Sequence, residues 1–252
     1  MKNDITIPVI NLTATNSTST YIKELCKRQK PEEFTTVVSN FQSAGYGQTG
    51  NTWESESGKN LLFSFVFYPT TCLPRQQFYL SQFISLAIEE SLSRFADGFS
   101  IKWPNDIYWQ DKKICGIIIE IEICGNTIQQ CVPGIGIDVN QTIFRSSAPN
   151  PVSLAQITGK EYDTEELLGD IMARIRNYYQ LFKDGKIDVI TNRYFKSLYR
   201  REGMHKYQDS DGVFMAKIID ILPLGTLVLE DNEKKRREYN FKEVSFIIDE
   251  EN

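Results

Sequence analysis

Apolar residues recur along this chain with two spacings, one typical of helices and one of strands. The helical spacing predicts helices over residues 18–28, 74–95, 164–183 and 188–200. In the second of these, Phe83 and Ala87 lie on the apolar side, Glu90 lies nearer the opposite side, and Pro74 suits a first helical turn. The pattern therefore predicts substantial helical layers.

Short apolar runs bounded by Gly, Pro, Asn or Asp predict strands. Those before Gly203 cover residues 35–40, 61–68, 100–103, 113–123, 128–132 and 134–139. Those after it cover residues 213–218, 227–230, 237–241 and 244–248, and such closely spaced short strands favour a small barrel. We predict an α+β protein, with a mixed central sheet flanked by helices over residues 1–202 and a small β-barrel over residues 203–252.

The composition excludes several classes of protein but does not indicate a function. The 252 residues are 41% apolar and 24% charged, as in ordinary globular proteins, and a net charge of −5 argues against bulk attraction to nucleic acid. The most apolar stretch, residues 114–123, is short and interrupted by Glu120 and Glu122, and the first residues do not resemble a signal peptide. We therefore expect a cytoplasmic protein without a membrane partner.

Cysteine and histidine usage narrows the chemistry further. The five cysteines are irregularly spaced and form no C-x-x-C pair, so neither a disulfide framework nor a zinc site is predicted. The single histidine, His205, follows the predicted boundary and is expected at the surface. Mechanisms that need several histidines are nearly excluded.

Three segments carry residues suited to anion chemistry. The first, residues 42–53, contains Gly45, Gly47 and Gly50, whose backbone can approach an anion closely and present N–H groups to it. It lacks the Gly-Lys-Ser/Thr ending of a Walker loop, and it leads to a strand rather than to the helix of a Rossmann fingerprint. A plain surface loop remains open for this segment.

The other two segments lie on predicted strands. Residues 102–106 read Lys-Trp-Pro-Asn-Asp and Lys113 follows closely; lysines suit phosphate or carboxylate, and an aspartate can hold Mg²⁺ or accept a proton from an amine. Gly134 and Gly136 alternate along a strand, which indicates close approach of a ligand or of another backbone. A simple hairpin and a tightly packed core strand, respectively, remain the alternatives.

Taken together and in this order, the three segments resemble the biotin–protein ligase family. The glycine loop ending at Trp53 and the Lys-Trp-Pro-Asn-Asp run match its motifs. Further matches cover residues 16–19, 58–61, Ser64, 113–118, 134–140 and 243–245. The resemblance covers nearly the whole chain. It implies a class II synthetase-like catalytic core over residues 1–202 and an SH3-like domain over residues 203–252, the short form without an N-terminal DNA-binding domain.

The resemblance also implies an activity and its partners. Such an enzyme forms biotinyl-5'-AMP from biotin and ATP with Mg²⁺, then transfers biotin to a lysine on the carrier domain of a biotin-dependent carboxylase. No nucleic-acid or membrane partner is expected, and a homodimer stays open.

Site residues are carried over position by position. The positions that match the biotin site are Ser17, Thr18, Ser19, Gln42, Gly45, Tyr46, Gly47, Gln48, Lys113 and Gly116. The positions that match the ATP site are Trp53, Asn105, Gly136 and Asp138. Lys113 matches the lysine that contacts the biotin carboxylate and the phosphate. Lys102 and Asp106 match residues near the α-phosphate, the metal and the acceptor lysine, although no metal ligand is certain.

The chain departs from the family pattern at five positions. Tyr46, Gln48 and Asn51 stand where arginine is frequent, and Ser19 and Asp138 stand where asparagine is expected. Each lost arginine removes a charge-assisted bond worth about 1.5–3 kcal/mol. An ionised aspartate also cannot donate a hydrogen bond to a ring nitrogen of adenine. These changes indicate weaker binding of ATP or the intermediate, while the retained lysines and glycines still favour activity.

Three other functions stay open. A lipoate or octanoate ligase would share the fold, although the Lys-Trp-Pro-Asn-Asp run favours biotin. A non-catalytic, biotin-binding paralogue would account for the departures. A bifunctional repressor would need a DNA-binding domain ahead of Ile10, where the catalytic pattern begins.

Overall fold

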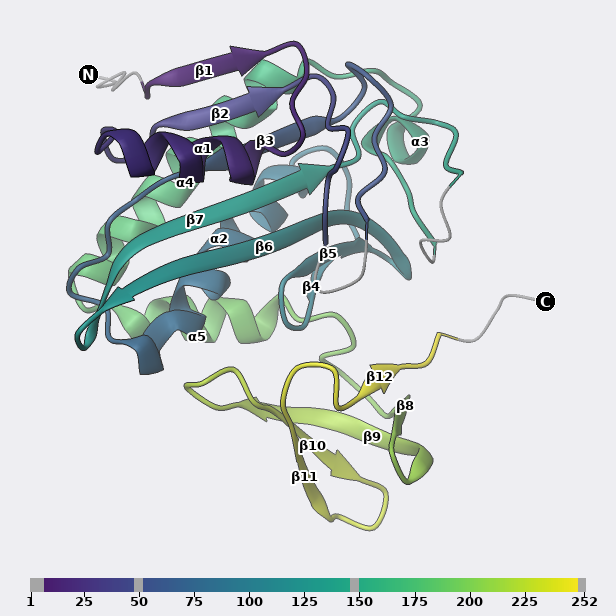
Figure 1. Ribbon diagram of the computed structural model, residues 1–252. Coiled ribbons are helices and arrows are strands. Elements are labelled where there is room, and N and C mark those ends of the chain that lie inside the picture. The colour runs from purple at the N-terminus through teal and green to yellow at the C-terminus, as the bar shows by residue number, and fades with distance from the viewer. Residues whose placement is uncertain (1–6, 48–51, 146–149, 249–252) are drawn as a thin grey trace. The chain divides into compact units, whose positions relative to one another are not determined.

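The computed structural model describes residues 7–47, 52–145 and 150–248 (Figure 1). These residues belong to two compact units, each built from two stretches of the chain. The first unit takes Met1–Pro74 and Lys112–Met172, and the second takes Arg75–Asp111 and Ala173–Asn252. The domain boundary expected near Gly203 stays a prediction.

The first unit is built on a mixed sheet. Its strands are β1 (Val9–Leu12), β2 (Thr36–Ser39), β3 (Leu61–Phe65), β6 (Lys112–Cys124) and β7 (Thr127–Ile137). They lie in the order β1-β2-β3-β7-β6. Strand β1 runs parallel to β2, and the other neighbours are antiparallel. The predicted mixed sheet is confirmed.

Strand β3 is buried on both faces, which explains its unbroken apolar and aromatic sequence. Phe63 and Phe65 stack at a ring-centroid distance of 6.5 Å, and Phe65 and Phe67 stack at 5.7 Å. Phe34 stacks on Phe67 at 6.1 Å. This aromatic row fills the centre of the unit.

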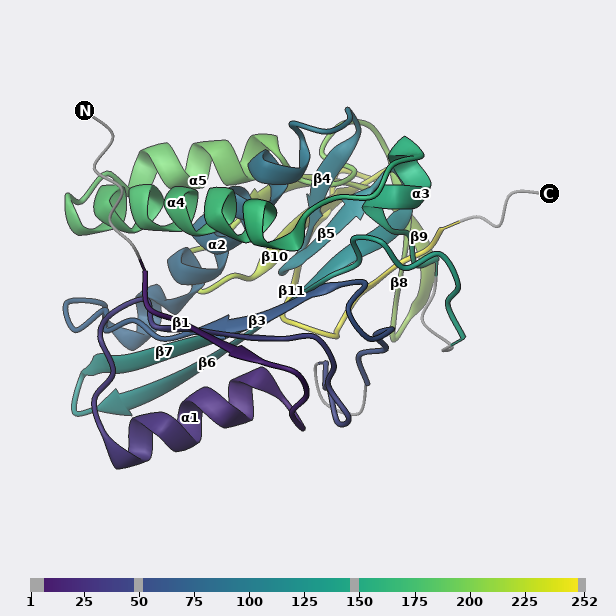
Figure 2. The ribbon, with the colours of Figure 1, turned by 90° about the horizontal axis from the view of Figure 1, so that it is seen from above.

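Helix α1 (Thr18–Arg28) covers one face of this sheet, as Figure 2 shows, and contacts β2, β3 and β7. Its fully buried Ile22 packs with Val37, Val66 and Val132. The predicted helix over residues 18–28 has these bounds. Its first turn is thereby fixed against the sheet, where the predicted biotin residues lie.

Two further helices follow β7. The short α3 (Leu154–Thr158) begins with a capping box made by Ser153 and Gln156, and sequence periodicity was too brief to predict it. Helix α4 (Thr164–Lys183) has the predicted bounds. The Asp163 carboxylate accepts the backbone N–H of Glu165 at 2.8 Å, which satisfies one free donor of its first turn.

The second unit combines helices with two β elements. It contains most of a short 3₁₀ turn (Pro74–Gln76), α2 (Gln77–Leu92), α5 (Ile187–Lys196), β4 (Phe99–Lys102) and β5 (Asp106–Trp109). Phe83 of α2 packs against Tyr179 and Phe182 of α4, with ring centroids 6.2 Å apart in both pairs. Strands β4 and β5 form an antiparallel hairpin.

A five-stranded antiparallel sheet completes the second unit. It contains β8 (His205–Asp209), β9 (Gly212–Ile221), β10 (Leu227–Asp231), β11 (Arg236–Tyr239) and β12 (Ser245–Phe246). The order is β11-β10-β9-β8-β12. This sheet agrees with the predicted SH3-like domain.

Local bounds differ from the sequence prediction in instructive ways. The segments predicted as 128–132 and 134–139 form one strand, β7. Pro133 does not interrupt it, because Pro133 lies between two points of pairing: Gly134 pairs with β3, and Cys131 forms a bridge with Phe67. A proline without an N–H is tolerated there. The helix predicted to reach residue 200 ends at Lys196, because the chain after it pairs with Ile101 of β4.

Two broader observations concern the described residues only. None of their helices combines the length and apolar character needed to cross a membrane. The five cysteines are all unpaired, in agreement with their irregular spacing.

Candidate active site

The first part of the site is a group of four polar side chains, called here the polar cluster: Thr18, Ser19 and Ser64, which are buried, and Gln42, which is partly buried. Gln42 Oε1 accepts the backbone N–H of Thr18 at 2.7 Å and its hydroxyl at 3.1 Å. Ser64 Oγ lies 2.7 Å from Thr18 Oγ1 and 2.9 Å from Ser19 Oγ. The structure thus brings together predicted biotin residues from α1 and from the segment after β2.

Backbone pairing explains this meeting. Thr15 and Gln42 form a parallel bridge, and Ala44 N donates to Asn16 O at 2.9 Å, so the chain after β2 runs beside the chain before α1. Ser17 is the N-cap of α1 and is itself buried. The family motif match includes Ser64 without giving it a role; its position on β3, in contact with Thr18 and Ser19 of α1, shows that it belongs to the cluster.

The second part is a floor of glycines on adjacent strands. Gly116 of β6 pairs with Gly136 of β7, and Gly134 lies two residues before Gly136; together we call them the glycine strip. A Cβ at Gly136 would lie 2.5 Å from the ring atom Cε2 of Trp53, and one at Gly116 would lie 2.8 Å from Cζ3. A Cβ at Gly134 would lie 2.1 Å from Ser19 Oγ. Glycine is required here because Trp53 and α1 lie against the bare backbone.

Lys113 lies at the Trp53 end of this strip. Its Nζ is 5.9 Å from the centroid of the Trp53 ring. Its backbone is fixed on both sides, because Lys113 N donates to Asn150 O at 2.9 Å and Val152 N donates to Lys113 O at 2.9 Å. The predicted catalytic lysine and the predicted nucleotide-binding tryptophan are therefore neighbours.

Asp138 follows Gly136 on the same side of the chain and is almost completely buried. Its Oδ1 has no hydrogen-bond partner, and neither has the buried Nε1 of Trp53. Burial raises the pKa of Asp138 well above its ordinary value; the positive charge of Lys113 opposes this shift and the negative charge of Glu54 adds to it. A buried carboxyl of this kind favours the protonated form, which can donate a hydrogen bond.

The glycine loop begins and ends in a short ladder. Trp53 N donates to Gly45 O at 2.9 Å, and Tyr46 bridges Thr52. Gly45 also lies close to the side-chain amide of Gln42: a Cβ atom added to Gly45 would lie 3.2 Å from Gln42 Nε2. Gly47 follows Tyr46 within the described residues, whereas Gln48 and Asn51 fall outside them.

The remaining predicted residues, Lys102, Asn105 and Asp106, belong to the second unit. Lys102 and Asp106 are direct partners across the β4–β5 hairpin. Lys102 Nζ lies 5.3 Å from the ring centroid of Tyr108 and 5.0 Å from that of Phe246. The hairpin therefore holds the lysine and the aspartate side by side.

Neighbouring elements of the second unit fix the turn of this hairpin. The Trp103–Pro104 bond is cis. Trp103 is buried, and its Nε1 donates to Gly225 O at 2.9 Å. The Tyr194 hydroxyl donates to Pro104 O at 2.8 Å. The tryptophan and proline of this run thus serve the shape of the turn.

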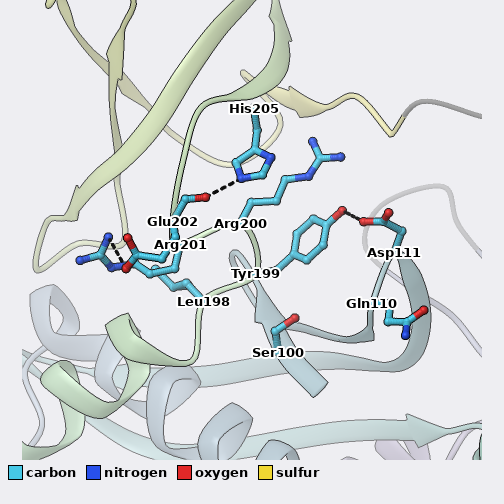
Figure 3. A pocket seen from close by; sticks show the side chains of 9 residues that line it. All are labelled: Ser100, Gln110, Asp111, Leu198, Tyr199, Arg200, Arg201, Glu202 and His205. Atoms are coloured by element: carbon cyan, nitrogen blue, oxygen red, sulfur yellow. Dashed lines mark hydrogen bonds and ion pairs between the residues drawn. The ribbon is translucent and has the colours of Figure 1, made fainter. Parts of the chain in front are cut away.

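A separate hollow of about 500 Å³ lies in the second unit (Figure 3). It is lined by Ser100, Gln110, Asp111, Leu198, Tyr199, Arg200, Arg201, Glu202 and His205. The Tyr199 hydroxyl points to Asp111, and His205 Nε2 lies 2.7 Å from Glu202 O. None of the predicted site residues lines this hollow.

Comparison with known proteins identifies the class. The model of the biotin/lipoate A/B protein ligase family matches residues 12–138. The match includes the polar cluster, the glycine strip, Trp53 and the Lys-Trp-Pro-Asn-Asp turn. The chain belongs to the biotin/lipoate A/B protein ligase family.

Individual relatives point to its biotin branch. The bifunctional ligase/repressor BirA of Bacillus subtilis is 28% identical over 245 residues, which cover 89% of this chain and 70% of that protein. The biotin–[acetyl-CoA-carboxylase] ligase of Paracoccus denitrificans is 32% identical over 145 residues, covering 54% of this chain and 59% of that protein.

A solved structure extends the likeness to the fold. Biotin protein ligase from Aquifex aeolicus, in complex with biotin and ATP, superposes with a TM-score of 0.78 at 26% identity, covering 94% of this chain and 97% of that one. The predicted fold class is thereby confirmed.

Proposed function

We propose that this chain is a biotin–protein ligase, which forms biotinyl-5'-AMP from biotin and ATP and then transfers biotin to a lysine of a carrier domain. The relatives named above support the activity. The feature of this chain that carries the proposal is the polar cluster at one end of the glycine strip, with Lys113 and Trp53 at the other.

The polar cluster favours biotin over lipoate. The ureido group of biotin has two N–H donors and one carbonyl acceptor, and the hydroxyls and carboxamide of Thr18, Ser19 and Gln42 can serve both. The dithiolane of lipoate has no such donors or acceptor, so it would gain none of these hydrogen bonds. In this proposal Ser17, Gly45, Tyr46, Gly47, Gln48 and Gly116 complete the biotin site.

In the first step, a carboxylate oxygen of biotin attacks the α-phosphorus of ATP, and the bond to pyrophosphate breaks. Two anions must meet, and the ammonium groups of Lys113 and Lys102 offset their repulsion. Mg²⁺ enters with ATP as part of the substrate. Such an ion is held mainly by the nucleotide phosphates, with one or two protein carboxylates at most.

The second step transfers the acyl group. The carrier lysine, as a free amine, attacks the carbonyl carbon of the mixed anhydride, the bond to AMP breaks, and the amine loses a proton. Asp106 is proposed to orient that amine or to accept its proton. No enzyme nucleophile is required. Trp53, Asn105, Gly136 and Asp138 are proposed to bind the nucleotide.

The proposed partner is the biotin carboxyl carrier domain of a biotin-dependent carboxylase. The name of the Paracoccus relative supports an acetyl-CoA carboxylase as the acceptor. We place the reaction in the cytoplasm, and the enzyme acts either alone or as a homodimer.

The test is direct. The chain is incubated with MgATP, an unmodified carrier domain and either biotin or lipoate, and the carrier mass is measured. We expect a mass gain with biotin only. A K113A variant should lose it by roughly 100-fold or more in rate, since Lys113 balances charge in the transition state. K112A, at the exposed neighbouring position of β6, is the matched control and should behave as wild type.

A second function, a biotin-binding protein without catalysis, is motivated by Tyr46 and Asp138 in place of the family's arginine and asparagine. Biotin binding without pyrophosphate release in the presence of MgATP would support it and would refute the ligase proposal.

A further inference from the structure

Tyr46 joins the glycine loop to the sheet through its side chain. Its hydroxyl donates a hydrogen bond to Glu120 Oε2 at 3.0 Å, and the residue is 37% exposed. The backbone of Tyr46 is already fixed by the bridge to Thr52. The residue therefore has two attachments, one at the base of the loop and one on β6.

Glu120 is held in turn from α1. Its Oε1 lies 2.6 Å from Lys23 Nζ, and both side chains are 34% exposed. Burial lowers the pKa of Lys23, but the hydrogen bond and charge of Glu120 outweigh this, so the pKa of Lys23 lies above its ordinary value. Lys23 thus remains a cation, and Tyr46, Glu120 and Lys23 form a connected group, called here the anchor triad.

The anchor triad lies at the far end of the glycine strip from Trp53. Along β6, Gly116, Ile118 and Glu120 share one face because successive residues alternate. Trp53 lies on Gly116, and Ser19 of α1 lies on Gly134, the partner of Ile118. One helical turn beyond Ser19, Lys23 reaches Glu120. The strip between Trp53 and the triad spans about 13 Å of strand.

We propose that Glu120 is a positioning residue of the ligase: by holding the Tyr46 hydroxyl, it keeps the Tyr46 ring across the end of the glycine strip and slows escape of biotin and of its adenylate. This inference rests on the proposed function. Family members often have arginine at the position of Tyr46. In this chain, an uncharged hydroxyl that donates to the Glu120 carboxylate takes the place of that positive charge.

The hydrogen bond has an anionic acceptor, which strengthens it, but both partners are partly exposed, which weakens it. Removing it should accelerate release of biotin, and of a non-hydrolysable biotinyl-adenylate analogue, by about fivefold, corresponding to about 1 kcal/mol. Attack of water on the intermediate, measured as AMP formation without carrier, should rise by a similar factor.

The experiment compares Y46F, E120Q and the double variant, with ligand release followed by Trp53 fluorescence. Each single variant should release ligand faster, and the double variant should be no faster than either, because all three break the same bond. Y46R, which retains a donor for Glu120, should keep slow release, and Y46R/E120Q should lose it. Release at the wild-type rate in Y46F, or additive effects in the double variant, would overturn the proposal.

Two further measurements separate the possible failures. K27A, which breaks the exposed Lys27–Glu24 ion pair of 2.6 Å on α1, should leave release unchanged; an equal effect would show that release responds to the loss of any polar surface contact and overturn the proposal. If the wild type neither binds biotin nor releases pyrophosphate, the proposed function fails. The anchor triad is then judged by hydrogen exchange at the amides of residues 44–47, which E120Q should accelerate; unchanged exchange would refute it.

Discussion

The two ends of the glycine strip differ in how their buried polar groups are satisfied. In the polar cluster, Thr18, Ser19, Gln42 and Ser64 are bonded to one another before any ligand arrives. At the other end, Trp53 Nε1 and Asp138 Oδ1 are buried without partners. Unsatisfied buried groups cost free energy, so they persist mainly where function needs them. We infer that the end proposed for biotin is preorganised, whereas the end proposed for the nucleotide is completed by its ligand.

The largest effect is expected from G136A, which disturbs the Trp53 end of the glycine strip, the end proposed for the nucleotide. Its Cβ would lie 2.5–2.8 Å from three atoms of the Trp53 indole, so the ring must move. Misplacement of about 1 Å costs roughly 100-fold in rate, and overpacking lowers the free energy of unfolding by about 1–3 kcal/mol. Pyrophosphate release and thermal unfolding measure the two effects.

The matched control is G169A. Gly169 lies in α4 with open space around the added methyl, so the variant should gain about 0.5–1 kcal/mol of stability and keep its activity. An active G136A enzyme would show that Trp53 need not lie on the strip.

An intermediate effect is expected from S64A, which removes a hydroxyl from the polar cluster, the end proposed for biotin. Ser64 is fully buried and contacts the hydroxyls of both Thr18 and Ser19. Its loss should lower the free energy of unfolding by about 1–3 kcal/mol and weaken biotin binding by about tenfold, while the affinity for ATP stays the same. Titration calorimetry with each ligand separates the two.

Ser43 offers the comparison for that variant. Its hydroxyl donates to Asn16 Oδ1 at 2.9 Å in an exposed position, so S43A should change stability by less than about 0.5 kcal/mol. Equal effects of S64A on biotin and on ATP would argue against separate ends of the site.

The smallest and most graded effect is expected from D138N. The folded pKa of Asp138 lies above its unfolded value, so between the two values the folded state binds more protons than the unfolded state. The free energy of unfolding of the wild type should therefore fall as pH rises through this window, by about 1.4 kcal/mol for each unit that separates the two pKa values. D138N should lack this loss.

Melting curves from pH 4 upward, recorded for both proteins, measure that difference. Parallel stability profiles would show that Asp138 carries no raised pKa. In the same series, ATP affinity should weaken with rising pH in the wild type and stay flat in D138N, since an asparagine donates at every pH.

Much of the fold followed from local pattern. Helices α1 and α4 have their predicted bounds, because amphipathic spacing and end signals agree in both. Strands β1, β5 and β8 were not predicted, because they are short and lack a clear apolar alternation. The partner of β1 lies distant in sequence, whereas β5 and β8 pair with neighbouring strands in hairpins. The length of β7 depended on which neighbours flank Pro133, which no local pattern reveals.

The site divides in the same way. Motif matching singled out Lys113 and most members of the polar cluster and of the glycine strip, because each stands in a short segment that matches a family motif. It missed Lys23 and Glu120, although a carboxylate in an apolar strand was a visible signal. Their link to Tyr46 joins three segments that only the folded chain brings together. The protonation of Asp138 likewise depends on burial that the sequence does not encode locally.

The attachment of Trp103 bears on how this protein could be trimmed as a laboratory labelling tool. Its indole is bonded to Gly225 and packs on Phe241 with ring centroids 5.3 Å apart, and Phe241 and Phe246 both come from the last fifty residues. A shortened version ending near residue 202 would strip the Lys102 hairpin of these supports. Any smaller biotinylating reagent built on this protein must therefore keep residues 203–252.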